Sequence, residues 1–233
     1  MQSDIHGNPA VIPAGVQDIA LQQSRVLRNT YLLLALTMVP TAIGAYIGIG
    51  TGGIIMQNPI VSFFVLLAGV IGLQFAIARY RNSSVGVLLL LAMTFILGWW
   101  LGPLLAVALT LKNGPQLVGV AAIGTGAIFF AMAGIATTVK KDFSFMGKFL
   151  FVGMIVALLA IVANMFLQIP ALALTISAMV VVVFALFLLH DVSRIVNGGE
   201  TNYIMAATGC YISLFNIFAN LLHLLMALAG ERD

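Results

Sequence analysis

Three ionisable side chains stand close together near residue 190 of the 233-residue chain, where a long apolar run ends. They are His190, Asp191 and Arg194. Arg194 is placed three residues after Asp191, so an ion pair on one helix face could hold the carboxylate ionised at little cost. Alternatively, protonation of Asp191 could change how this helix closes against the next one. The three residues therefore form a candidate pH gate.

A second set of polar side chains lies inside the last apolar run. At about 100° per residue they fall, with Gly209, on one arc of a helix; they are Ser213, Asn216, Asn220 and His223. This arc must face other helices or water, because an amide facing lipid would leave its hydrogen bonds unmade. Two interpretations follow: hydrogen bonds to neighbouring helices that fix the rotation of this helix, or a polar pathway for an ion or proton. Either one predicts that the last helix is central.

Composition identifies the environment of both sets. Hydrophobic residues make up 62% of the chain and charged residues 7%, which leaves too little polar surface for a soluble globule. We therefore expect an all-α integral membrane protein. Seven apolar segments are long enough to cross a bilayer of roughly 30 Å as helices; they are Tyr31–Ile49, Ile60–Ala78, Val85–Leu111, Leu117–Val139, Met146–Gln168, Ala171–Leu189 and Tyr203–Ala229.

Two domains are expected. Residues 1–28 lack the pattern of a cleaved signal and contain Pro9 and Pro13, which predicts a flexible cytoplasmic tail; residues 29–233 form the transmembrane domain. The basic residues set the orientation. With the N-terminus in the cytoplasm and the C-terminus in the periplasm, the outer side holds two of them, Lys112 and Arg232, and the inner side holds eight; these are Arg25, Arg28, Arg79, Arg81, Lys140, Lys141, Lys148 and Arg194.

Small residues and breakers indicate packing and helix ends. Gly44 and Gly48, Gly98 and Gly102, and Ala122 and Gly126 are each four apart, a spacing that lets helix backbones approach closely. In the loop before the last helix, Gly198 and Gly199 are expected to end one helix. Thr201 or Asn202 is expected to cap the next one, with Glu200 near its positive end.

Motifs for catalysis are missing from the sequence. Neither GxSxG nor HExxH is present, the three histidines are far apart, and Cys210 is the single cysteine. We therefore expect no metal, no cofactor and no enzymatic activity; isolated serines and Cys210 are all that would support an intramembrane hydrolase. The basic residues form no continuous stripe, which argues against nucleic acid as a partner.

Four strings in order carry a resemblance to a known family. They are VLRNTY, KDFSFMGKFLFVGMI, ANMFLQIPALALTISA and GGETNYI followed by SLFNIFANLL. Together they resemble the bacterial YccA branch of the Bax inhibitor-like (TMBIM) family, from about Arg25 to Asp233. The resemblance implies seven helices with the last one surrounded by six. It also implies an inner-membrane protein that modulates the membrane-anchored protease FtsH and is its slow substrate, seized by the N-terminal tail.

Other branches of this family suggest an alternative function. They resemble a pH-sensitive calcium or cation leak in which aspartates on the sixth and seventh helices share a proton. Asp191 matches the first aspartate. Ser213 stands at the position expected for the second and cannot titrate. One carboxylate and one hydroxyl make a poor calcium site, because calcium prefers six to eight oxygen ligands.

Overall fold

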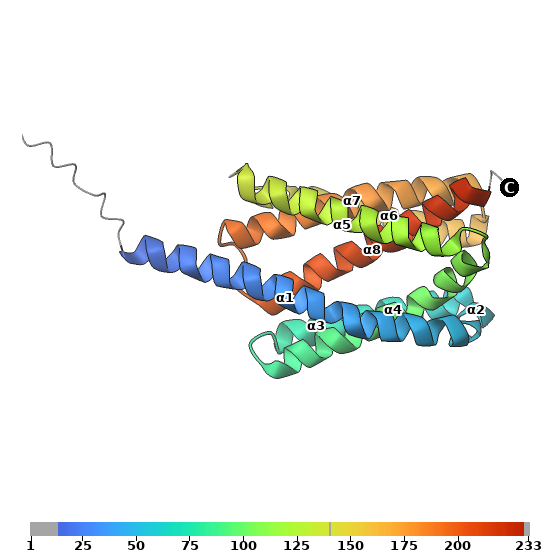
Figure 1. Cartoon of the computed structure of the whole chain (residues 1–233), viewed down its shortest axis with the longest axis horizontal. Helices are drawn as coiled ribbons and strands as arrows, with labels where there is room; N and C mark the ends of the chain where they lie inside the picture. Colours follow the sequence, from blue (N-terminus) through green and yellow to red (C-terminus); the bar gives the residue numbers. More distant parts are fainter. Residues whose placement is uncertain (1–13, 140, 231–233) are drawn as a thin grey trace, which may run out of the picture.

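Helices form all the regular structure in the described part of the chain, residues 14–139 and 141–230 of a computed structural model (Figure 1). Seven of them are long and apolar enough to span a membrane, which confirms the predicted fold class. The elements in order are α1 (Ala14–Thr51), α2 (Gly53–Gln57), α3 (Pro59–Arg79), α4 (Ser84–Thr110), α5 (Gly114–Thr138), the 3-10 turn η1 (Ser144–Met146), α6 (Gly147–Leu167), α7 (Pro170–Val196) and α8 (Tyr203–Gly230).

Helix α1 starts earlier than the sequence predicted. It begins at Ala14, so residues 14–28 are helical although we placed them in a flexible tail; residues 1–13 lie outside the described part. Strong helix formers such as Leu21 and Arg25 follow Pro13, and no further proline interrupts the helix before Pro40. Tertiary packing also holds this extension, because Val26 is buried against Ile195 and Ala206.

Glycines bring α1 and α4 into close contact. A β-carbon on Gly44 would lie 2.9 Å from the Trp99 nitrogen, and one on Gly48 would lie 3.0 Å from the Gly102 Cα. Any larger residue would push the two backbones apart. The predicted close approach at these glycines is therefore confirmed.

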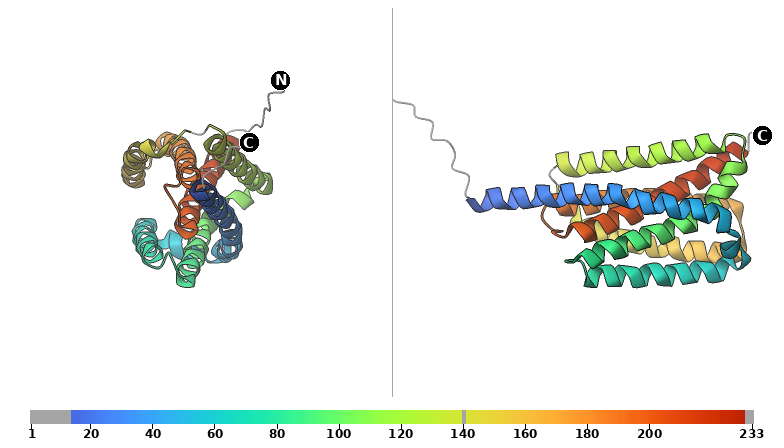
Figure 2. Two further views of the ribbon diagram at one scale, coloured as in Figure 1. Left: turned by 90° about the vertical axis from the view of Figure 1, so that its left-hand side faces the viewer. Right: turned by 60° about the horizontal axis from the view of Figure 1, so that its bottom comes forward.

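Helix α8 occupies the centre of the bundle. It packs against α1, α3, α4, α5 and α7, whereas α6 packs mainly on α7 and lies at the periphery. From Tyr203 to Ala229 only Leu228 is exposed. Figure 2 shows the other helices arranged around α8 in the end-on view. The central last helix is confirmed, although α6 contributes little to the wall around it.

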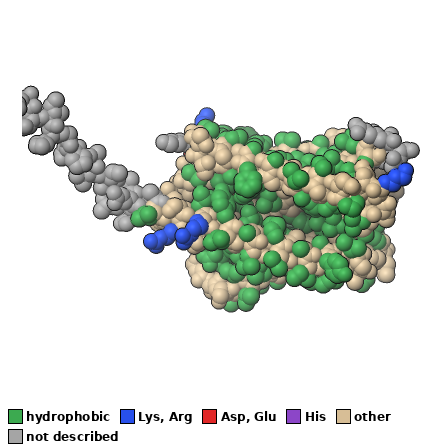
Figure 3. Space-filling model, in the orientation of Figure 1, with side chains coloured by type: hydrophobic (Ala, Val, Ile, Leu, Met, Phe, Trp, Pro, Cys, Tyr) green, Lys and Arg blue, Asp and Glu red, His purple; other side chains and the backbone are tan. Residues whose placement is uncertain are grey.

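On the face drawn in Figure 3, the Lys and Arg side chains of the described residues lie at the ends of the molecule. In the space-filling view the belt between the ends is mostly hydrophobic, and the blue Lys and Arg side chains lie at its two edges (Figure 3). Large exposed side chains on this belt include Phe75, Ile123 and Phe130. Such a surface is stable in a bilayer and not in water.

Candidate functional site

Asp191 lines a small polar hollow where α3, α7, α8 and the loop before α8 meet. The hollow has a volume of 180 Å³ and also exposes Gln74, Arg194, Glu200 and Thr208. Asp191 Oδ1 lies 3.1 Å from His190 Nδ1, and the side chain of Asp191 is 19% exposed. The hollow thus gathers two carboxylates and one guanidinium from the end of α7 and the loop that follows it, and Gln74 of α3 faces them from a distant part of the sequence.

His190 links this cluster to the start of α6. A β-carbon on Gly147 would lie 2.8 Å from His190 Nε2, so the imidazole sits directly against the α6 backbone. His190 is buried, and its Nδ1 faces Asp191. The imidazole therefore stands between the carboxylate and the peripheral helix.

Arg194 does not form the ion pair that we considered with Asp191. Its Nη2 lies 3.5 Å from Glu200 Oε2 and donates a hydrogen bond of 3.2 Å to the carbonyl of Gly199. The guanidinium points toward the loop because both of its acceptors, the Glu200 carboxylate and the Gly199 carbonyl, lie there. Among the described residues, the side chain that contacts the Asp191 carboxylate at hydrogen-bond distance is His190.

Gly209 is the α8 residue that faces Asp191. A β-carbon at Gly209 would stand 2.7 Å from Asp191 Oδ2. Ser213, which we placed at the second aspartate position of the leak-type relatives, lies one turn further along α8 and is buried. The second carboxylate in the hollow is Glu200, which comes from the loop.

The two asparagines of the polar arc bond within α8. Asn216 Nδ2 donates to the carbonyl of Ile212 at 2.8 Å, and Asn220 Nδ2 donates to the carbonyl of Asn216 at 2.8 Å. Both side chains are half-buried. The interpretation of these amide groups as donors to neighbouring helices is therefore wrong; they saturate carbonyls of their own helix.

His223 and Tyr211 do join α8 to its neighbours. His223 Nδ1 lies 2.9 Å from Ser177 Oγ on α7. The Tyr211 hydroxyl lies 2.8 Å from Thr41 Oγ1 on α1 and 3.2 Å from the Thr94 carbonyl on α4, to which it donates. Tyr211 was not among the residues predicted from the sequence, although a tyrosine in the middle of an apolar span needs a partner for its hydroxyl.

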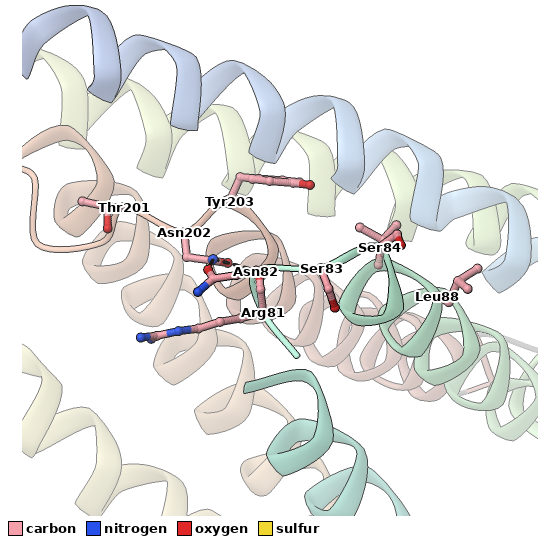
Figure 4. Close-up of a pocket in the computed structure, with 9 residues that line it drawn as sticks. Arg81, Asn82, Ser83, Ser84, Leu88, Thr201, Asn202 and Tyr203 are labelled. Carbon is pink, nitrogen blue, oxygen red and sulfur yellow. Dashed lines mark hydrogen bonds between the residues drawn. The ribbon is translucent and has the colours of Figure 1, made fainter. Parts of the chain in front are cut away.

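Asn202 ties the start of α8 to the loop between α3 and α4. Its Oδ1 accepts from the nitrogens of Ile204 and Met205 at 3.1 Å each, so Asn202 is the cap and Thr201 is not. Its Nδ2 donates to the Arg81 carbonyl and to Asn82 Oδ1, both at 2.8 Å. These groups border an open hollow of 680 Å³, drawn in Figure 4.

Clusters that could hold a metal are missing from the described residues, where no three His, Cys, Asp or Glu side chains come together. Cys210 is a buried free thiol on α8. With seven apolar helices, buried polar groups that are hydrogen-bonded and charges at the ends, the chain is a multi-pass membrane protein.

Comparison with known proteins gives the family. The family model described as "Inhibitor of apoptosis-promoting Bax1" matches residues 23–230, and the chain belongs to this Bax inhibitor family. It is 40% identical over 205 residues to the "Modulator of FtsH protease YccA" of Escherichia coli K12, covering 88% of this chain and 91% of that protein.

Other relatives have the same extent. An Escherichia coli O6:H1 protein named "Inner membrane protein YccA" is 40% identical over 88% of this chain and 91% of its own length. A Neisseria meningitidis serogroup A protein is 39% identical over 214 residues, 91% of this chain and 94% of its own. The predicted resemblance is confirmed.

Proposed function

We propose that this chain is an inner-membrane protein that binds and modulates the membrane-anchored protease FtsH and has no enzymatic activity of its own. The observation that carries the proposal is its 40% identity, over 88% of its length, to a protein named as a modulator of that protease. The match covers the bundle and not a single segment. A modulator needs no catalytic group, and none of the motifs sought in the sequence is present.

Affinity capture tests this binding. The tagged full chain is purified from detergent-solubilised membranes beside an unrelated multi-pass protein that carries the same tag at the same expression level. We expect FtsH in the first preparation and not in the second. Equal amounts of the protease in both would contradict the proposal.

We further propose that the N-terminal residues serve as the handle by which the protease slowly degrades this protein. An unfolding protease engages an end that it can pull. Because α1 begins at Ala14, deletion of residues 2–13 removes the end and leaves the helix whole. A deletion to Gln23 would also remove helical residues and confuse the result.

Turnover measurements distinguish the handle from general instability. We expect the deletion of residues 2–13 to slow degradation in cells with active FtsH. The control replaces residues 2–13 by a Gly/Ser segment of equal length. This variant is degraded like the native chain if the protease needs only a flexible end of that length. Unchanged turnover of the deletion variant would refute the handle.

The orientation with the N-terminus in the cytoplasm is also a proposal. It is supported by basic residues such as Arg25, Arg79 and Arg81 at one end of the bundle, against Lys112 at the other. A membrane-impermeant thiol reagent should label Asn113→Cys in intact spheroplasts and spare Thr138→Cys. The reverse pattern would invert the topology.

A second candidate function is a pH-sensitive cation leak. The hollow that holds Asp191 and Glu200 favours it, because two carboxylates beside the central helix are a feature of ion pathways. Flux into proteoliposomes is compared for the native chain and Asp191→Asn between pH 5 and 8, the range in which histidine side chains commonly change charge. Asp142→Asn, at an exposed carboxylate outside the hollow, is the control. Equal and negligible flux in all three would eliminate the leak.

A further inference from the structure

A hollow of 480 Å³ lies beside the central helix and opens sideways between α1 and α5. It is lined by residues of α1, α4, α5 and α8. Both α1 and α5 pack against α4 and α8, but they do not pack against each other. The open side of the hollow therefore lies between α1 and α5. In Figure 1, α8 is visible behind the space between α1 and α5.

One end of this opening is closed by aromatic rings. Tyr31 on α1 and Phe129 on α5 meet edge to face, with ring centroids 5.6 Å apart. Past this pair the hollow is open, and its floor includes Phe215 and Phe218 of α8. The side chains bordering it, such as Met38, are partly exposed at the lipid-facing surface.

Hydroxyl groups in the hollow already have partners. Thr41 Oγ1 donates to the Thr37 carbonyl at 2.7 Å, Thr125 Oγ1 donates to the Ala121 carbonyl at 2.7 Å, and the Tyr211 hydroxyl donates to the Thr94 carbonyl. No buried side-chain polar atom of the described residues lacks a partner. Water needs two to four polar partners to occupy a cavity. An apolar occupant therefore fits this hollow, and water does not.

Small residues on α5 keep the hollow open. A β-carbon on Gly126 would have no atom within 4 Å, whereas one on Gly98 of α4 would lie 2.9 Å from the Thr41 Cα. Ala122 and Gly126 were expected to let two helices approach closely. In the structure they border empty space, so that interpretation is wrong for this pair.

We propose that this hollow binds one acyl chain of a membrane lipid, which enters between α1 and α5. The hollow is continuous with the hydrophobic belt that contacts the bilayer, where acyl chains are the neighbours of Phe130 and Ile123. Its volume is within the range of about 300–1,000 Å³ that holds small ligands. A transmembrane helix, with a diameter of about 10–12 Å and a length of about 30 Å, has several times the volume of the hollow, so the hollow cannot enclose one. An acyl chain restores the dispersion contacts that an empty cavity forfeits.

Photolabelling tests the site. The full chain is reconstituted in phosphatidylethanolamine and phosphatidylglycerol vesicles that contain a trace of phospholipid with a diazirine near the end of one acyl chain. After irradiation, labelled peptides are mapped by mass spectrometry. We expect label on Phe215 and Phe218, inside the hollow, as well as on the lipid-facing Phe130.

Filling the hollow should remove only the inner label. Gly126 lines the hollow and a β-carbon there meets no atom within 4 Å, so the ring of Gly126→Phe is expected to occupy the hollow. Label on Phe215 and Phe218 should then be lost and label on Phe130 should stay. Gly134→Phe is the matched control, because Gly134 is exposed on the same helix and also has no atom near its β-carbon. Ala122→Phe, one turn from Gly126, should repeat the loss. Circular dichroism and gel filtration establish that each variant is folded.

Two results would overturn the proposal. One is label on Phe130 alone in the native chain, which would mean that lipid stays outside. The other is undiminished label on Phe215 in folded Gly126→Phe and Ala122→Phe, which would mean that the reagent reaches α8 by another route.

Discussion

Asp191 and Gly209 face each other across the contact between α7 and α8, so closely that a β-carbon on Gly209 would lie 2.7 Å from Asp191 Oδ2. The carboxylate thus rests against the backbone of the central helix. Gly209 belongs to the small and polar face that the sequence singled out on α8. In the structure, the lack of a side chain at Gly209 lets the Asp191 carboxylate approach the α8 backbone.

Substitution of Gly209 by alanine should destabilise the protein. Alanine is normally the better helix residue by about 1 kcal/mol, but here its methyl group displaces the Asp191 carboxylate, and overpacking costs about 1–3 kcal/mol. Thermal unfolding in detergent measures the change. Gly134→Ala, which meets nothing, should be neutral or stabilising. Rescue of Gly209→Ala by Asp191→Ala but not by the equally large Asp191→Asn would identify the clash as steric. A gain in stability for Gly209→Ala as large as that for Gly134→Ala would refute it.

Removal of the Tyr211 hydroxyl should loosen α8 from α1 and α4. Tyr211→Phe deletes the contacts with Thr41 and the Thr94 carbonyl. Hydrogen bonds between membrane helices contribute about 0.6 kcal/mol on average, so we expect a loss of about 0.6–1.7 kcal/mol. Tyr46→Phe, at a side chain that is 80% exposed, is the control and should change nothing. Equal unfolding curves for the two variants would contradict this role.

Loss of the Asn202 side chain should fray the start of α8. Asn202→Ala removes the cap from Ile204 and Met205 and also the link to the Arg81 carbonyl, and a helix cap alone contributes about 1 kcal/mol. Asn202→Asp keeps the cap and lacks the donors, so its stability should lie between those of Asn202→Ala and the native chain. Hydrogen exchange at residues 204–206 provides the local measurement. Thr201→Ala should leave that exchange unchanged; similar exchange in both alanine variants would argue against the cap.

Asp142 should titrate below its ordinary value. It lies in the loop before η1, where the hydrogen bonds of Ser144 to its carboxylate lower its pKa from 3.8. The nitrogen of Ser144 donates one of these bonds at 2.8 Å. Because the pKa is lower in the folded state, this stabilisation is present above pH 3.8 and is lost as the pH falls through the folded pKa.

Carbon-13 NMR of labelled aspartate measures this titration. Ser144→Ala should move the pKa of Asp142 toward its ordinary value, because the side-chain hydrogen bond is the largest cause of the shift. Ser83→Ala, in the exposed loop before α4, is the control and should leave it in place. A native pKa at or above the ordinary value would refute the assignment.

The sequence alone determined the membrane class, the number of spans and the central place of the last helix. These follow from the length of apolar runs and from the cost of a polar arc in lipid, both of which are local properties of the chain. It also identified the glycines at the contact between α1 and α4. For the cap of α8 it left two candidates, Thr201 and Asn202, of which Asn202 is the cap. The start of α1 was misplaced, because helix formers continue upstream of the apolar run and Val26 packs on distant residues.

Only the tertiary structure decided the partners of the polar side chains. Arg194 pairs with Glu200, Asp191 with His190, and Asn216 with its own helix, because each group takes the nearest acceptor or donor that the packed bundle offers. Spacing in the sequence fixes the face of a helix but not the neighbour opposite it. For the same reason Gly98 closes a helix contact and Gly126 borders a hollow, although both were assigned to the same four-residue spacing of small residues.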